Sequence, residues 1–153
     1  MNRCECPTED SLGCLTNLSA MAARNYLTRQ LFLHGIDMTI EQFKVMVVLW
    51  KEEISTQQNI ADFVGKDKTS VTRLIAGLEK RSLIRRSTDQ NDKRCNLVTL
   101  TPQGIALEKP TMEVLGEATR YLQHGIDPDE LAITLRVLKQ MCLTLNYTQK
   151  ESE

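Results

Sequence analysis

The chain has 153 residues, of which 41% are hydrophobic and 25% are charged, and its formal net charge at pH 7 is −1. This length and composition fit one globular domain with a sizeable core and exclude a largely disordered protein. The longest apolar run, near residues 45–50, is too short to cross a bilayer, and the first six residues lack the features of a signal peptide, so we expect a cytoplasmic protein without membrane contact. Five irregularly spaced cysteines predict reduced thiols rather than a disulfide framework.

Two helices are predicted in the first third of the chain. Apolar side chains recur at spacings of three and four over residues 10–34, which is typical of a helix. Thr39, followed three residues later by Gln42, forms a capping box for a second helix. This second helix is rich in large apolar residues and ends near residue 52, so we expect it to be mostly buried.

A short third helix and a fourth helix follow, separated by a tight turn. Ser55 is expected to cap the third helix, and Gly65 supplies the residue that a sharp turn needs. Asp67 then caps the fourth helix, whose inner side is apolar and whose outer side is polar. Two short helices joined by a tight turn are typical of a helix-turn-helix, whose second helix fits the major groove of DNA.

Positive charge is concentrated between residues 66 and 94. This segment holds nine Lys or Arg against four Asp or Glu, a local charge of +5, which leaves −6 on the rest of the chain. Such a basic surface is typical of nucleic-acid binding. We therefore expect the outer face and the N-terminal end of the fourth helix to contact bases and phosphates. The residues assigned to this role are Lys66, Lys68, Thr69, Ser70, Thr72 and Arg73.

A β-hairpin with a basic tip is predicted next. Residues 83–86 and 96–100 are short, partly β-branched runs on either side of a polar segment. An arginine on such a tip, here Arg94, is suited to insertion into a narrow minor groove. Asp92 is placed to hold that guanidinium in a fixed fork, and Lys93 adds a second cation. Taken alone, the tip also fits a solvated turn.

Two further helices are predicted at the C-terminal end. A Thr-Pro pair at residues 101–102 opens a fifth helix that runs toward residue 122. Pro110 is expected to kink or interrupt this helix near residue 109. An Asp-Pro pair at residues 127–128 opens a sixth helix, whose leucines recur as they do on a helix that packs against another helix.

Together these segments resemble the MarR family of winged helix-turn-helix transcriptional regulators over nearly the whole chain. The segments that carry the resemblance are residues 38–43, 67–75, 78–86, 92–94 and 100–104. The resemblance implies a mainly α fold with a small β-hairpin wing. It also implies a DNA-binding lobe at residues 37–100 and a helical dimerisation region formed by residues 1–36 and 101–153.

The resemblance also implies how the protein works. Members of the family bind double-stranded DNA as homodimers at inverted repeats, most often as repressors. In this chain the implied base or phosphate readers are Thr69, Ser70, Thr72 and Arg73, and the implied wing arginine is Arg94, supported by Asp92. Two residues depart from the family pattern. Ser82 stands where a glycine is usual, so a left-handed residue there is mildly strained, and Gly77 weakens the fourth helix by roughly 1 kcal/mol relative to Ala.

Two kinds of control are compatible with the resemblance. Family members release DNA when small aromatic or lipophilic compounds bind between the DNA-binding lobe and the dimer helices, and we expect this chain to do the same. The alternative is oxidation of Cys14, which lies where the organic-peroxide-responsive branch has its sensing cysteine. Phe43 stands where that branch has a tyrosine next to Gln42, however, and a buried, inert Cys14 is the simpler interpretation.

Other classes of function have weaker support. Cys4 and Cys6 form one close pair of thiols without a second pair, so we expect no metal site and no cofactor. The two histidines stand at predicted helix ends, and no nucleophile is paired with a base, so we do not expect an enzyme. A winged-helix module that binds an acidic protein partner remains a second alternative.

Overall fold

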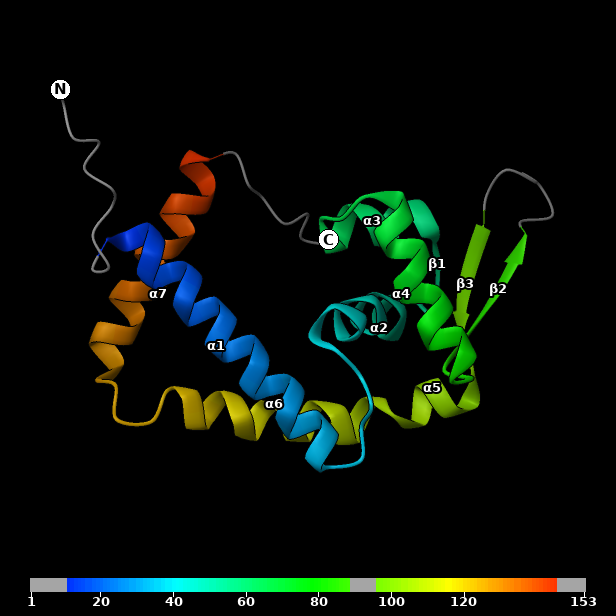
Figure 1. The fold of residues 1–153 in the computed structure, drawn as a ribbon, viewed down its shortest axis with the longest axis horizontal. Coiled ribbons are helices and arrows are strands. Elements are labelled where there is room, and N and C mark those ends of the chain that lie inside the picture. The colour runs from blue at the N-terminus through cyan, green and yellow to red at the C-terminus, as the bar shows by residue number, and fades with distance from the viewer. Residues whose placement is uncertain (1–10, 89–95, 146–153) are drawn as a thin grey trace, which may run out of the picture.

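The computed structural model describes residues 11–88 and 96–145, which form seven helices and a three-stranded antiparallel sheet (Figure 1). No helix within these two ranges is both long and apolar enough to span a bilayer. In chain order the elements are α1 (Leu12–Leu33), α2 (Ile40–Glu52), β1 (Ile54–Thr56), α3 (Gln57–Val64), α4 (Lys68–Lys80), β2 (Ile84–Thr88), β3 (Asn96–Leu100), α5 (Pro102–Ala106), α6 (Glu108–Leu122) and α7 (Pro128–Thr144).

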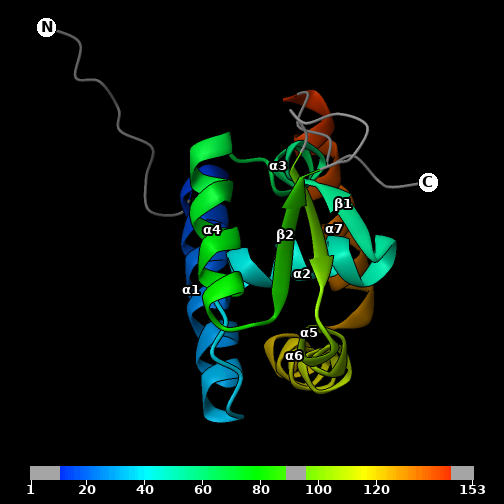
Figure 2. The ribbon, with the colours of Figure 1, turned by 90° about the vertical axis from the view of Figure 1, so that its right-hand side faces the viewer.

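The helices and the sheet divide the molecule into a lobe and a set of long arms. Figure 1 shows α2, α3, α4 and the sheet gathered at one end, while α1, α6 and α7 reach toward the other. Figure 2 shows α5 and α6 end-on beneath the sheet. α1 packs on α6, and the ring of Tyr26 stacks on that of Tyr121 with 5.3 Å between centroids. The predicted fold class, mainly α with a small β-hairpin wing, is confirmed.

The sheet contains one strand that the sequence did not predict. Strands β2 and β3 form the expected hairpin, and β1 pairs with the other side of β3 to give the order β1-β3-β2. Ser55, expected to cap α3, lies within β1 opposite Val98 and is buried. The cap is Thr56, whose hydroxyl accepts the Asn59 backbone N–H at 3.1 Å. Because strand pairing holds Ser55 in the sheet, the helix begins one residue later than expected.

The predicted fifth helix is two helices. The interruption is confirmed, but it lies at Leu107 rather than near residue 109, and Pro110 is in the first turn of α6. A proline ring clashes with the carbonyl four residues earlier, here that of Ala106, so one continuous helix is unfavourable. In the first turn of a helix the missing N–H removes no intrahelical hydrogen bond. The proline therefore breaks the helix upstream of itself.

The turn after α4 is hydrogen-bonded to the residue that caps α5. Ser82 has φ 59°, which confirms the expected left-handed residue at this position. Its carbonyl accepts the Thr101 hydroxyl, and that hydroxyl in turn accepts the Gly104 backbone N–H at 3.1 Å. A Cβ at Gly104 would lie 2.0 Å from the Leu83 carbonyl oxygen. A residue without a side chain is therefore required where α5 crosses the turn.

One apolar core supports both the lobe and the arms that cross it. It is formed mainly by α2, α3, α4 and the sheet, and it also includes Leu31 of α1 and Val114 and Leu115 of α6. The lobe expected at residues 37–100 therefore shares its core with α1 and α6. In contrast, α7 is described along its whole length and has no buried residue.

Candidate nucleic-acid interface

A tight turn and a capped helix end position the N-terminus of α4. Gly65 closes α3 with a left-handed φ of 67°, and its N–H donates to the Ala61 carbonyl. Asp67 caps α4 by accepting the backbone N–H and the hydroxyl of Ser70, at 2.9 and 2.6 Å. The Ser70 hydroxyl, followed by the backbone N–H groups, lowers the pKa of the Asp67 carboxyl. The Ser70 hydroxyl therefore already has a partner within the helix cap.

The outward face of α4 carries an exposed stripe at helical spacing. Thr69, Arg73, Ala76 and Lys80 follow one another at intervals of four, three and four residues, and all four are exposed. Lys66 and Lys68 are also exposed and flank the helix N-terminus, where the Asp67 carboxylate accepts the Ser70 N–H, so anion binding there depends on the two lysine ammonium groups. Lys80 was not among the residues assigned from the sequence, although the same 3.6-residue periodicity places it on the stripe.

Thr72 lies between the stripe and the protein interior. It is half-buried, its hydroxyl accepts a hydrogen bond from Gln57 Nε2, and it donates to the Lys68 carbonyl at 2.8 Å. The partner, Gln57, is a buried polar residue in the first turn of α3. Sequence reasoning did not single out Gln57, because the contact depends on how α3 packs against α4. A role for Thr72 in base contact stays a prediction, and the structure gives its hydroxyl two protein partners.

The wing is joined to α4 by a charged side-chain pair. Arg86 of β2 donates from its backbone N–H and from Nε to the Glu79 carboxylate, at 3.2 and 2.8 Å, and Nη2 makes a shorter contact with the same group. The Arg86 side chain lowers the pKa of Glu79, an effect that outweighs partial burial of the carboxyl. The pair holds the first wing strand against the C-terminal half of α4.

Some of the expected site lies outside the described residues. The expected wing-tip residues Asp92, Lys93 and Arg94 are in this category, as are Cys4 and Cys6. Cys14 is described: it is half-buried in the first turn of α1, and its backbone N–H donates to the Ser11 hydroxyl at 3.3 Å. Within residues 11–88 and 96–145, no three His, Cys, Asp or Glu side chains are grouped so as to hold a metal ion.

A groove of about 480 Å³ runs between α1 and the segment that leads into α2. Two arginines of α1, Arg24 and Arg29, line it together with the ring of Phe32. Arg24 also pairs with Glu41 of α2 at 3.3 Å. The carboxylates of Asp37 and Glu41 also line the groove, so its two positive charges are matched by two negative ones. Guanidinium groups beside an aromatic ring can pair with and stack on a planar organic anion.

Comparison with known proteins places the chain in a family. Residues 38–96 match the MarR family. The chain is 30% identical over 115 residues to the multiple antibiotic resistance protein MarR of Salmonella typhimurium, a match that covers 72% of this chain and 77% of that protein. The chain belongs to the MarR family. Matches to two other curated relatives of this MarR-family chain span 66% and 50% of their lengths.

Two solved structures resemble this MarR-family chain closely. One is a mutant of MarR from E. coli in complex with operator DNA, at 26% identity and a TM-score of 0.78, covering 85% of this chain and 92% of that one. The other is BpsR from Bordetella bronchiseptica, whose DNA binding is regulated by 6-hydroxynicotinic acid, at 25% identity and a TM-score of 0.75, covering 85% and 97%. The sequence resemblance to the MarR family is therefore confirmed.

Proposed function

We propose that this MarR-family chain is a sequence-specific, DNA-binding transcriptional regulator that acts as a homodimeric repressor. The observation that carries the proposal is the exposed stripe of α4, on which Thr69 and Arg73 face outward beside Lys66 and Lys68. Hydroxyl and guanidinium groups are suited to base edges, and lysines at a helix N-terminus are suited to phosphates. The operator complex of a structural neighbour with the same fold supports this proposal.

The proposal includes the wing. The wing residues Asp92, Lys93 and Arg94 are assigned to the minor groove beside the bound α4, with Asp92 supporting the Arg94 guanidinium. Ser70 and Thr72 are kept in the interface, in positions where their hydroxyls already have protein partners. The proposal places the protein in the cytoplasm and gives it no catalytic role and no cofactor.

Exposed apolar side chains support a dimer built from the arms. α7 has no buried residue, yet Ile133, Leu135, Val137 and Leu143 are large, apolar and exposed. At the other end of the chain, α1 exposes Leu12, Leu15, Leu18 and Met21. Helices that expose apolar side chains are stabilised when they pack against another helix, and a second copy would supply matching surfaces. We therefore assign dimerisation to residues 1–36 and 101–153, and DNA binding to residues 37–100.

The groove between α1 and α2 is our candidate effector site. Arg24 and Arg29 with Phe32 suit a small aromatic acid, and the regulation of a structural neighbour by 6-hydroxynicotinic acid supports this ligand class. Occupation of the groove would disturb the contact between Arg24 and Glu41, which joins a dimer arm to the lobe. We therefore propose that binding of the ligand releases DNA. Oxidation of the half-buried Cys14 is the alternative trigger.

The test is a binding titration with DNA from upstream of the protein's own coding sequence. We expect a specific complex whose affinity falls steeply with salt, since each neutralised phosphate contributes about −0.9 to the slope of log affinity against log salt. Salicylate, as a probe aromatic acid, should weaken the complex, and a peroxide should have no effect on either the wild type or Cys14→Ser. Equal and weak binding of upstream and random DNA by folded protein would refute the proposal and favour a protein-interaction module.

A further inference from the structure

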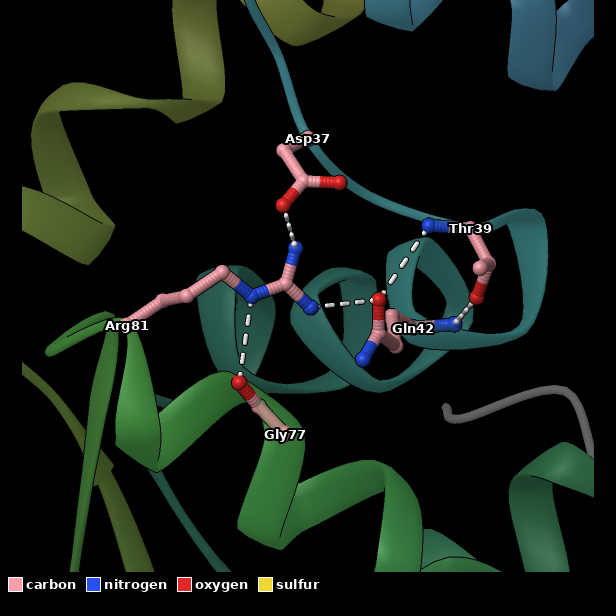
Figure 3. A network of polar contacts seen from close by, with 5 residues as sticks. All are labelled: Asp37, Thr39, Gln42, Gly77 and Arg81. Atoms are coloured by element: carbon pink, nitrogen blue, oxygen red, sulfur yellow. Dashed lines mark hydrogen bonds and ion pairs between the residues drawn. The ribbon is translucent and has the colours of Figure 1, made fainter.

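Arg81, at the C-terminal end of α4, contacts its own helix, α2 and the segment before α2 (Figure 3). Its Nε donates to the Gly77 carbonyl of α4 at 3.1 Å, and its Nη2 donates to Gln42 Oε1 of α2 at 2.6 Å. Its Nη1 lies 3.4 Å from the carboxylate of Asp37, in the segment between α1 and α2. The Arg81 side chain is only 27% exposed. The guanidinium therefore lies between α4 and α2, with two donors occupied at that junction and a third facing the exposed carboxylate of Asp37.

The contact with Gln42 is itself fixed by the cap of α2. Gln42 Oε1 also accepts the Thr39 backbone N–H at 3.2 Å, while the Gln42 backbone N–H donates to the Thr39 hydroxyl at 3.2 Å. A carbonyl oxygen has two acceptor sites, and here one serves the cap and the other serves Arg81. The end of α4 is thus attached to a side chain that cannot rotate away without losing its half of the capping box, the hydrogen bond from the Thr39 backbone N–H.

Gly77 makes this approach possible. A Cβ at this position would lie 2.8 Å from Gln42 Nε2, so the end of the Gln42 side chain would have to move away from α4. The expectation from sequence was only that Gly77 weakens α4. The structure adds a reason for a glycine here, because the missing side chain lets the amide of Gln42 lie against α4 and reach Arg81.

We propose that Arg81 is a positioning residue for DNA recognition, one that fixes the orientation of α4 relative to α2 and the segment before it without contacting DNA. Apolar packing of Val71, Ile75 and Leu78 buries α4, but such packing is non-directional. The planar guanidinium restricts the orientation of α4, because all of its hydrogen bonds can form in only one arrangement of the neighbouring elements. The exposed stripe of α4 is thereby presented to DNA in a single orientation. This inference rests on the proposed function.

The test compares specific with non-specific DNA binding by the 153-residue chain. The specific probe is the duplex that the wild-type protein enriches from a random library, and the non-specific probe is the same duplex shuffled. Arg81→Ala and Gln42→Ala should lower the ratio of the two affinities by about tenfold or more, comparable with one mismatched base pair. The salt slope should stay unchanged, since no phosphate contact is lost.

Thr39→Ala is the matched control. It removes the hydroxyl that caps α2 but leaves Gln42 Oε1 in contact with Arg81, so it destabilises the same helix end while the ratio should stay within about twofold of the wild type. Asp37→Asn removes a negative charge, and by electrostatics alone this change strengthens DNA binding. Loss of positioning instead lowers the ratio of the specific to the non-specific affinity. Circular dichroism at the assay temperature confirms that each variant is folded.

The outcomes separate the two proposals. An unchanged ratio in Gln42→Ala would overturn the positioning role, even if Arg81→Ala failed to fold. A parallel fall of both affinities in Arg81→Ala, with a salt slope reduced by about 0.9, would show a phosphate contact instead. If the wild-type protein enriched no sequence at all, the proposed function would itself be refuted.

Discussion

Arg86 of β2 and Glu79 of α4 are joined through both the backbone and the side chain of the arginine, so that one carboxylate holds the wing strand and α4 together. The two residues lie on different elements that converge beyond the turn at Ser82. Because the pair depends on an ionised carboxylate, its strength is tied to pH.

Replacing Glu79 with Gln should lower the free energy of unfolding at pH 7 by about 1 kcal/mol or less, since the pair is partly exposed and screened by water. The pKa of Glu79 is lowered in the folded protein below its ordinary value of 4.5. Its contribution is therefore complete above that ordinary value and is lost as pH falls through the folded pKa. Urea denaturation of wild type and Glu79→Gln should show a constant difference from pH 7 to pH 5 that shrinks on further acidification. A difference that grows with acid would contradict the assignment.

Gly104→Ala should be strongly destabilising. The new Cβ would lie 2.0 Å from the Leu83 carbonyl oxygen, which is backbone and cannot rotate away, so we expect a loss of about 3 kcal/mol or more. Gly116→Ala in α6 is the matched control, because its Cβ would meet only the end of the Arg120 side chain at 3.7 Å. That variant should be neutral or stabilised by up to about 1 kcal/mol. Thermal denaturation of both variants checks the contrast, and equal melting temperatures would refute it.

Lys68→Ala should make the salt dependence of DNA binding less steep. If Lys68 neutralises one phosphate, the slope of log affinity against log salt should change by about 0.9, with specific and non-specific DNA affected alike. Lys109→Ala, at an exposed position of α6, removes the same charge away from α4 and should leave the slope unchanged. Fluorescence anisotropy over a salt series measures both. The same change of slope in the two variants would show that only overall charge matters.

Leu135→Glu should convert the proposed dimer to a monomer. Leu135 is 47% exposed on α7, and a charge buried there between two copies would be unpaired. Gln140→Glu adds the same side chain on another side of α7, at an exposed position that is already polar, and should leave the dimer intact. Sedimentation velocity at several concentrations distinguishes the two states. A dimeric Leu135→Glu would exclude the face around Leu135 from the interface.

Features that depend on neighbouring residues could be predicted from the sequence. The capping box of Thr39 and Gln42, the Asp67 cap and the left-handed Ser82 were all expected, and the structure confirms them. Each is decided by a few consecutive residues, because caps and turns satisfy backbone groups within one helical turn. The exposed residues of α4 likewise follow from the period of the helix.

Features that depend on distant residues could not be predicted. The strand β1 has only three residues, and its pairing opposite Val98 brings together parts of the chain that sequence periodicity treats separately. Gln57 next to Thr72 and Gln42 next to Arg81 likewise meet only because helices pack. As a result, the stripe of α4 could be predicted, whereas the contacts that orient it could not.

Two attachments hold the C-terminal end of α4, so a change in the tilt of this helix displaces its N-terminal end most. On one side Arg81 holds that end to α2, and on the other side the Thr101 hydroxyl holds the following turn to α5. The 13 residues of α4 span about 20 Å at 1.5 Å per residue, so a tilt of about 5° about the C-terminal end moves the N-terminal end by about 1.7 Å. A displacement of that size exceeds the tolerance of a hydrogen bond. Small changes in the angle between the arms would thus displace Lys68 and Thr69 most, because these residues lie furthest from the C-terminal end of α4.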